Sequence, residues 1–252
     1  MRALALLLAL ALPSACVGEA SAVIGPADFT PVLSPSAKQS LAHVGAYRLD
    51  VRPVTNAEFA QFVRSHPQWR RDRVASLFVD ADYLAHWPAA DRIGGEALPE
   101  QPVTRVSWYA ARAYCEARKA RLPTWYEWEY AAAANEHVTD ARTDPAWRER
   151  MLAWYARPGS DPLASAGLGT ANLYGVRDLH DLVWEWVEDF NSLMLNGGAR
   201  SDADTVNFCG AGALDAKDRE AYPVLMRIAF LSSLEARSTS RRLGFRCAVD
   251  VP

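Results

Sequence analysis

The stretch QPVTRVSWYAARAYCEARKARLPTWYEWEYAA, residues 101–132, contains the start and stop signals of two successive helices. Apolar residues at helical spacing predict the first helix over Ser107–Ala120, with the serine as its N-cap. Pro123 ends that helix, and Thr124 with Glu127 three residues later forms a capping box that starts the second helix. Because a helix stop is followed at once by a helix start, this stretch fixes the angle between two packed helices.

The regions on either side of this stretch predict short elements separated by long connections. A strand is expected within Ala42–Val51, and a capping threonine precedes an expected helix over Asn56–Arg64. Three segments are longer than the usual connections of a compact α/β domain, namely 66–104, 135–170 and 189–222. The pattern therefore predicts an irregular α+β fold with modest regular structure.

The composition describes one aromatic-rich globular domain. The chain has 252 residues, of which 50% are hydrophobic and 23% charged, and it carries 9 tryptophans. These values exclude intrinsic disorder, and the length does not comfortably supply two domains. Lys and Arg number 27 against 30 Asp and Glu, for a formal net charge of -3. Binding of nucleic acid through bulk charge is therefore not expected.

Residues 1–22 have the layout of a signal peptide. A basic start precedes a run of Ala and Leu over Ala3–Leu12, and small residues follow. The run is about half the ~20 residues that a membrane-spanning helix needs, so we expect a periplasmic or secreted protein with no transmembrane helix. Residues 23–40, rich in Ser, Pro and Ala, are interpreted as a linker, and 41–252 as the domain.

The processing of this leader has several alternatives. Small residues at Gly18 and Ala20, or at Ala20 and Ala22, each suit a signal peptidase. Cys16 follows Pro-Ser-Ala, so lipoprotein processing at this cysteine is a further alternative.

Four segments occur in an order and spacing that identify a family. They are PVTNAEF at 53–59, the stretch at 101–132 quoted above, NLYGVRDLHDLVWEWVEDF at 172–190, and LGFRCAVD at 243–250. Together they closely resemble the formylglycine-generating enzyme family, also called sulfatase-modifying factors, which includes pyoverdine-maturation proteins. The resemblance implies a single-domain variant of the C-type lectin fold. It also implies a disulfide between Cys115 and Cys247, because the family places a bridge between those two contexts.

This chain differs from the formylglycine-generating enzymes at the residues that correspond to their catalytic centre. Formylglycine-generating enzymes hold copper(I) with two nearby cysteines, and soft thiolates are the ligands that select this ion. The corresponding stretch here, DAKDREAYPVLMRIAFLSS at 215–233, contains no cysteine. Copper and formylglycine generation by that mechanism are therefore not expected.

The resemblance also points to a calcium site that is altered here. Asp181 and Leu182 stand where relatives have Gly-Asn before the Trp-Glu-Trp segment, and leucine offers no side-chain oxygen. Asp181 and Glu185 are the candidate calcium ligands that remain. If Glu185 is buried, an alternative is an ion pair with one of three C-terminal arginines, Arg227, Arg237 or Arg246.

The remaining candidates lie near the lost cysteine pair and the Trp-Glu-Trp segment. Cys209, between small residues, is predicted to border the central cleft as a reactive thiol or soft ligand, with a small buried hydrophobe as the alternative. Tyr222 and Arg227 flank the position of the lost cysteines and are the other catalytic candidates. Trp184 and His180 are candidate binding residues, with a core aromatic and a solvated turn residue as the respective alternatives.

Two functions of different classes follow from these residues. The first is an exported, formylglycine-generating-enzyme-like factor that modifies or matures a periplasmic protein or metabolite without the copper-cysteine pair. The second is a non-catalytic, lectin-like module that keeps its cleft to bind or scaffold a partner. One scaffold hosts different chemistries, so the sequence does not name the substrate or the partner.

Overall fold

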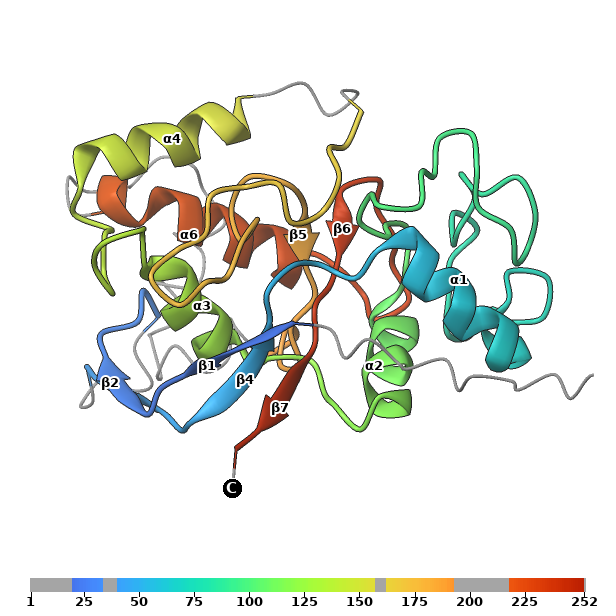
Figure 1. The fold of residues 1–252 in the computed structure, drawn as a ribbon, viewed down its shortest axis with the longest axis horizontal. Coiled ribbons are helices and arrows are strands. Elements are labelled where there is room, and N and C mark those ends of the chain that lie inside the picture. The colour runs from blue at the N-terminus through green and yellow to red at the C-terminus, as the bar shows by residue number, and fades with distance from the viewer. Residues whose placement is uncertain (1–19, 34–39, 157–161, 193–217, 252) are drawn as a thin grey trace, which may run out of the picture.

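A computed structural model describes residues 20–33, 40–156, 162–192 and 218–251 of the chain (Figure 1). The described residues confirm the predicted α+β architecture, with small sheets and short helices in one domain. The elements are β1 (Ser21–Ile24), β2 (Ala27–Phe29), β3 (Ala42–Val44), β4 (Tyr47–Asp50), α1 (Asn56–Ser65), the 3₁₀ helix η1 (Pro67–Trp69), α2 (Trp108–Ala117), α3 (Trp125–Ala133), α4 (Pro145–Tyr155), β5 (Trp184–Glu185), α6 (Asp218–Ser232), β6 (Leu243–Gly244) and β7 (Ala248–Asp250).

The main sheet joins the two ends of the domain. Its order is β1-β4-β7, with both outer strands antiparallel to β4. β2 pairs with β3, and β5 pairs in parallel with β6. The predicted linker over 23–40 is therefore wrong as far as Phe29, because these residues form part of β1 and all of β2. Ala22 and Ile24 are buried while Ser21 and Val23 are exposed, which is the alternation of a strand with one face on the core.

The helix caps predicted from the sequence are present. Thr55 and Thr124 each accept a hydrogen bond from the backbone of the glutamate three residues later, and Ser107 caps α2. The predicted strand over 42–51 is divided into β3 and β4. The segments expected to be irregular contain all of α4 and the beginning of α6, from Asp218 to residue 222. None of the described helices has the length and apolar character that a membrane crossing requires.

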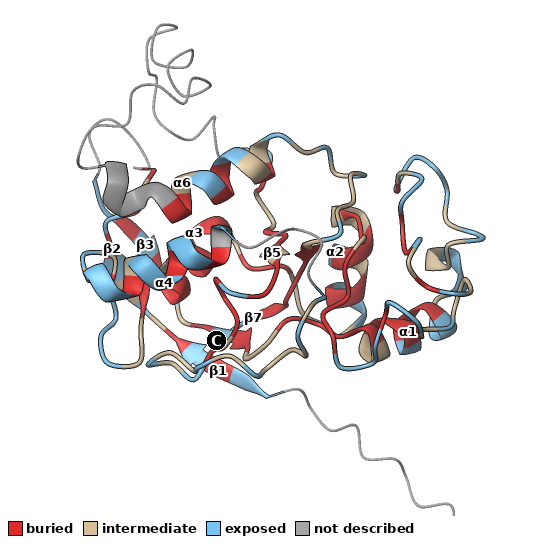
Figure 2. Ribbon diagram, turned by 90° about the horizontal axis from the view of Figure 1, so that it is seen from above, coloured by how far each residue is buried: buried red, intermediate tan, exposed pale blue. Residues whose placement is uncertain are grey.

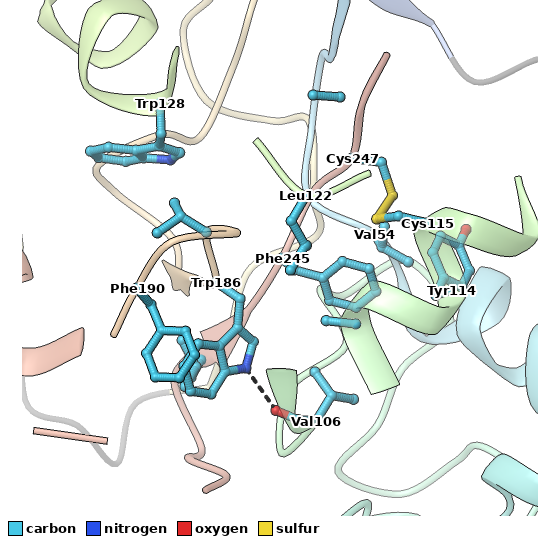
Figure 3. Close-up of a cluster of buried hydrophobic side chains, with 14 of the residues drawn as sticks. Val54, Val106, Tyr114, Cys115, Leu122, Trp128, Trp186, Phe190, Phe245 and Cys247 are labelled. Atoms are coloured by element: carbon cyan, nitrogen blue, oxygen red, sulfur yellow. Dashed lines mark hydrogen bonds between the residues drawn. A yellow bond between two sulfur atoms is a disulfide. The ribbon is translucent and has the colours of Figure 1, made fainter. Parts of the chain in front are cut away.

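Aromatic side chains fill the core between α2, β5 and β7. In Figure 3, the indole N–H of Trp186 donates to the carbonyl of Val106 at 3.0 Å, and Phe245 packs on Tyr114 with ring centroids 5.3 Å apart. Figure 2 shows buried residues on α2 and exposed residues on the outer side of α4.

The predicted disulfide closes this core. Cys115 on α2 and Cys247, immediately before β7, form a bridge across a sequence separation of 132 residues (Figure 3). In the chain-entropy model a loop of this length gives about 4–5 kcal/mol of stabilisation. The bridge joins the C-terminal segment before β7 to α2, the first of the two helices in the stretch at 101–132.

A buried ion pair lies at the centre of the fold. Glu185 on β5 and Arg246 are both 0% exposed, and the arginine donates to both carboxylate oxygens at 2.8–3.0 Å. Arg246 also donates to the backbone carbonyls of Asp50 and Arg177, at 3.1 and 2.9 Å. The indole N–H of Trp128 on α3 donates to Glu185 at 2.8 Å. Among the partners considered from the sequence, Arg246 is therefore the residue that pairs with Glu185.

A second buried carboxylate attaches the N-terminal segment to α3. Glu129 accepts hydrogen bonds from the backbone N–H of Val32 and the indole N–H of Trp125, both at 2.7 Å. A guanidinium nitrogen of Arg142 lies 3.4 Å from a carboxylate oxygen of Glu129, and the charge of Asp140 also acts on Glu129. Burial raises the pKa of Glu129 to about 7. This carboxyl group therefore titrates near neutral pH.

We predict that Glu185→Gln lowers the free energy of unfolding by about 3–5 kcal/mol, because Arg246 would remain buried without a countercharge. Urea unfolding measures this change. Glu136→Gln breaks the surface pair of Glu136 with Arg150 and is the control, with an expected loss of less than about 1 kcal/mol. A loss for Glu185→Gln as small as that of the control would contradict a central role of the pair.

We also predict a pH dependence of stability that Glu129 controls. Its pKa of about 7 in the folded protein lies above the ordinary 4.5, so between these values the folded state holds a proton that the unfolded chain has released. The free energy of unfolding therefore falls as pH rises through this window, by up to about 3 kcal/mol from this group. In Glu129→Gln this contribution disappears, as urea unfolding across the pH range would show. Identical pH profiles for the two proteins would refute the assignment.

Candidate functional site

A cavity in the described part of the chain opens beside the start of α1, and we call it the His86 cleft. Its volume is about 380 Å³, within the range of small-molecule sites. Its walls come from segments far apart in the sequence: Asn56, His86, Gly95, Glu96, Leu98, Gln101, Pro102, Thr104, Arg105, Pro162, Leu163, Arg241 and Arg242.

The base of the His86 cleft is fixed by hydrogen bonds. Asn56, 1% exposed, donates through its amide to the carbonyls of Leu98 and Gln101, and its side-chain oxygen accepts from the indole N–H of Trp87 at 3.1 Å. The Gln101 side chain accepts from the backbone N–H of Leu98 and donates to the carbonyl of Leu163 at 2.6 Å. These amides are occupied in holding the cleft together.

His86 differs from these amides, because neither ring nitrogen has a hydrogen-bond partner among the described residues. Burial, followed by the charges of Arg105, Arg241 and Arg71, lowers the pKa of His86 to about 4. The ring is therefore neutral at neutral pH, with one nitrogen able to donate and the other able to accept.

The charged groups of the cleft are mostly cationic, with three arginines against one glutamate. Arg105 lies 3.4 Å from Asp82, whose side chain is 72% exposed. Arg241 lies 3.7 Å from Glu96, and both side chains are mostly exposed. The Arg105 side chain itself is 15% exposed. An ion pair whose carboxylate is exposed to water contributes little to stability.

Several of the residues predicted from the sequence gather around Trp128 instead. The guanidinium of Arg227 lies 3.6 Å from the centre of the Trp128 ring and 5.5 Å from that of Trp184. His180 packs edge-on against Trp128 with ring centroids 5.4 Å apart. Glu185 accepts a hydrogen bond from the indole N–H of Trp128. The structure thus brings together four predicted residues, but as the core of the domain.

His180 is buried, which excludes the solvated-turn alternative. It is 7% exposed, one ring nitrogen bonds the carbonyl of Ala132 at 2.8 Å, and Trp147 packs on its other side at 5.3 Å. Burial lowers the pKa of His180 to about 4. Its ring lies at the wall of a second cavity, of about 290 Å³, between α3, α4 and residues 170–181.

The predicted calcium ligands have other roles. Asp181 is exposed, whereas Glu185 is fully buried and occupied by Arg246 and Trp128. Asp178 uses its carboxylate to accept from the backbone N–H groups of Gly167 and Gly169. The described residues hold no group of three or more His, Cys, Asp or Glu side chains that could bind a metal ion. The Glu185 carboxylate is therefore engaged within the core, and a calcium site at Asp181 stays a prediction.

The three catalytic candidates have different outcomes. Cys209 lies outside the described residues, and Tyr222 lies on α6 with its side chain outside them. Arg227 is 0% exposed and is not among the residues that line the His86 cleft or the cavity beside His180. Sequence reasoning missed His86, Arg105 and Arg241. Their only signal was an isolated histidine in a long connection and a pair of arginines before LGFRC.

Comparisons with known proteins agree with the resemblance of the sequence. Residues 21–251 match the family model described as the sulfatase-modifying factor enzyme 1-like domain. The chain is 31% identical to the formylglycine-generating enzyme of Streptomyces coelicolor over 249 residues, covering 81% of this chain and 78% of the relative. It is 30% identical to the inactive C-alpha-formylglycine-generating enzyme 2 of Mus musculus over 243 residues, covering 81% and 75%.

Among solved structures, PvdO from Pseudomonas aeruginosa is similar with a TM-score of 0.49 and 18% identity, over 91% of this chain and 93% of PvdO. The family match begins at residue 21, where β1 begins, and ends at 251. It thus covers every described strand and helix. The chain belongs to the sulfatase-modifying factor family, together with the formylglycine-generating enzymes.

Proposed function

We propose that this protein is an exported modification or maturation factor of the formylglycine-generating-enzyme type, and that its client binds in the His86 cleft. The observation that carries the proposal is the set of unused polar groups in that cleft. Among the described residues His86 has no hydrogen-bond partner, and Arg105 and Arg241 each form an ion pair with an exposed carboxylate, at 3.4 and 3.7 Å. A periplasmic protein or a metabolite is the proposed client.

The cysteines of the chain do not fit a copper site made of two thiolates. Cys115 and Cys247 are bonded to each other, which leaves Cys16 and Cys209 of the four cysteines. Cys16 belongs to the proposed leader, so the mature chain has one thiol. We propose that any chemistry uses Cys209 as a reactive thiol or soft ligand, with Tyr222 nearby. Arg227 would act on it only by positioning, since it is fully buried.

The second candidate function is a non-catalytic binding module. It is favoured by the similarity to a relative named as inactive, which is as extensive as the similarity to a named enzyme. The metal content of purified protein distinguishes the two. Stoichiometric metal that Cys209→Ala removes supports catalysis. Absence of metal together with absence of any oxygen-dependent change in a bound client supports the module.

We predict that the protein does not convert the cysteine of a Cys-x-Pro-x-Arg peptide to formylglycine when copper and oxygen are supplied. The reason is that two thiolates are needed to hold copper(I) and the stretch 215–233 supplies none. Mass spectrometry of the peptide measures the outcome, with the Streptomyces coelicolor enzyme as the positive control. Detection of the aldehyde product would overturn the prediction.

Export is the other part of the proposal, and the extent of β1 bears on the choice between the two signal-peptidase sites. Cleavage after Ala20 keeps β1 whole, at the cost of one hydrogen bond from Val51 to the Ala20 carbonyl. Cleavage after Ala22 would remove two of the four residue pairs that join β1 to β4, those of Ser21 and Ala22.

We therefore predict that the mature protein begins at Ser21. The intact mass and N-terminal sequence of protein recovered from the periplasm measure this start. A protein that begins at Val23, or at a lipid-modified Cys16, would contradict the prediction.

A further inference from the structure

The backbone beside the His86 cleft is strained at two residues. Leu84 and Arg105 have φ values of 49° and 53°, in the left-handed region that side chains other than glycine, asparagine and aspartate rarely adopt. The two residues hold each other, because the backbone N–H of Leu84 donates to the carbonyl of Arg105 at 2.9 Å. Strain of this kind persists only where surrounding contacts enforce it, and it is concentrated at functional sites.

The contacts that enforce this strain also bring together three separate cationic segments. The backbone N–H of Arg105 donates to the carbonyl of Ser240 at 3.0 Å, next to Arg241. Arg71 donates to the carbonyls of Leu84 and Trp87, on either side of His86. The side chain of Arg71 is thus committed to the backbone, whereas those of Arg105 and Arg241 face the cleft with weak partners.

The cleft also has an apolar part of its lining. Leu98, Pro102, Pro162 and Leu163 contribute to its walls. A cleft of about 380 Å³ that combines such residues with guanidinium groups suits a small organic acid better than an inorganic ion. Guanidinium groups bind carboxylates through paired N–H donors, and the neutral imidazole supplies a further donor.

We propose that the His86 cleft binds an organic carboxylate, held by Arg105 and Arg241 and hydrogen-bonded by His86. This inference rests on the proposed function, because it names the chemical class of the client of the same cleft. The carboxylate belongs either to a free small acid or to the end or an acidic side chain of a polypeptide. Binding displaces the exposed carboxylates of Asp82 and Glu96 from the two arginines.

The test follows the His86 ring by NMR in purified mature protein with labelled histidine, with His86→Gln used to assign the signal. Succinate is the charged probe, succinamide its neutral match, and inorganic phosphate the competing anion, at neutral pH and constant ionic strength. We expect a saturable shift of the His86 signal with succinate and none with succinamide. No shift with succinate, equal shifts with both organic probes, or tighter binding of phosphate would each overturn the proposal.

Three variants identify the groups responsible. Arg241 is exposed, so Arg241→Gln keeps the protein folded, and we expect it to weaken succinate binding about tenfold. Glu96→Gln removes the competing carboxylate and should strengthen binding. Arg237→Gln is the control, because Arg237 lies on the same segment but pairs with Glu235 and does not line the cleft. Equal affinities in all three variants would contradict the assignment.

A second arm distinguishes the two sources of the carboxylate. A short peptide with a free C-terminus is compared with the same peptide amidated, as its control, and with succinate. Tighter binding of the free peptide than of succinate indicates a polypeptide client. Weaker binding indicates a small acid. The outcome is separate from that of the proposed function. Modification of a neutral client without succinate binding would overturn this inference alone, and succinate binding without any modification would overturn catalysis alone.

Discussion

The buried ion pair of Glu185 and Arg246 is the interaction on which the rest of the fold depends. Its two residues reach, through direct hydrogen bonds, the end of β4, the loop at Arg177 and the indole of Trp128 on α3. Placing two charges in the interior costs several kcal/mol per ion, and only complete hydrogen bonding repays it. Here both carboxylate oxygens and the arginine nitrogens are used. Short strands that could not define a register alone are thereby held in one arrangement.

A second buried arginine is accommodated by a different device. Arg227 lies over the face of Trp128, the same indole whose N–H binds Glu185. Attraction between a cation and an aromatic face exceeds about 2 kcal/mol where water is excluded. Trp128 thus links the carboxylate at its edge to the cation on its face. Trp128 therefore shows one role of the many tryptophans of the sequence, which is to hold buried charged groups. This role explains why residues that looked like a catalytic cluster lie at the centre of the core.

The parts of the fold that the sequence predicted are those with local causes. Caps such as Thr55 and Thr124 depend on residues three positions apart. The disulfide was implied by the family resemblance rather than by any local pattern. The strand β1 was missed because its hydrogen bonds run to β4, more than twenty residues away, and its composition is that of a linker. The start of α4 carried a usable signal, since Asp144 caps it and Pro145 follows.

The His86 cleft could not be predicted from the sequence because no single segment contains it. Its walls join positions from Asn56 to Arg242, and the positive φ values of Leu84 and Arg105 have no signature in residue type. The resemblance directed attention to the Trp-Glu-Trp segment, where the characteristic residues are concentrated. In this structure Arg227, His180 and Glu185 pack around Trp128 in the core.

This arrangement separates the stability of the domain from its chemistry. The polar groups of Glu185 and Arg246 are hydrogen-bonded to each other, so a substitution there lowers the free energy of unfolding. In the cleft, the amides of Asn56 and Gln101 likewise form structural hydrogen bonds. Among the described residues His86 has no hydrogen-bond partner, and Arg105 and Arg241 pair with exposed carboxylates at 3.4 and 3.7 Å. On the proposal made for this cleft, substitutions at these positions change which ligand is recognised and have little effect on folding. Such a division would let one scaffold host different chemistries while its core stays the same.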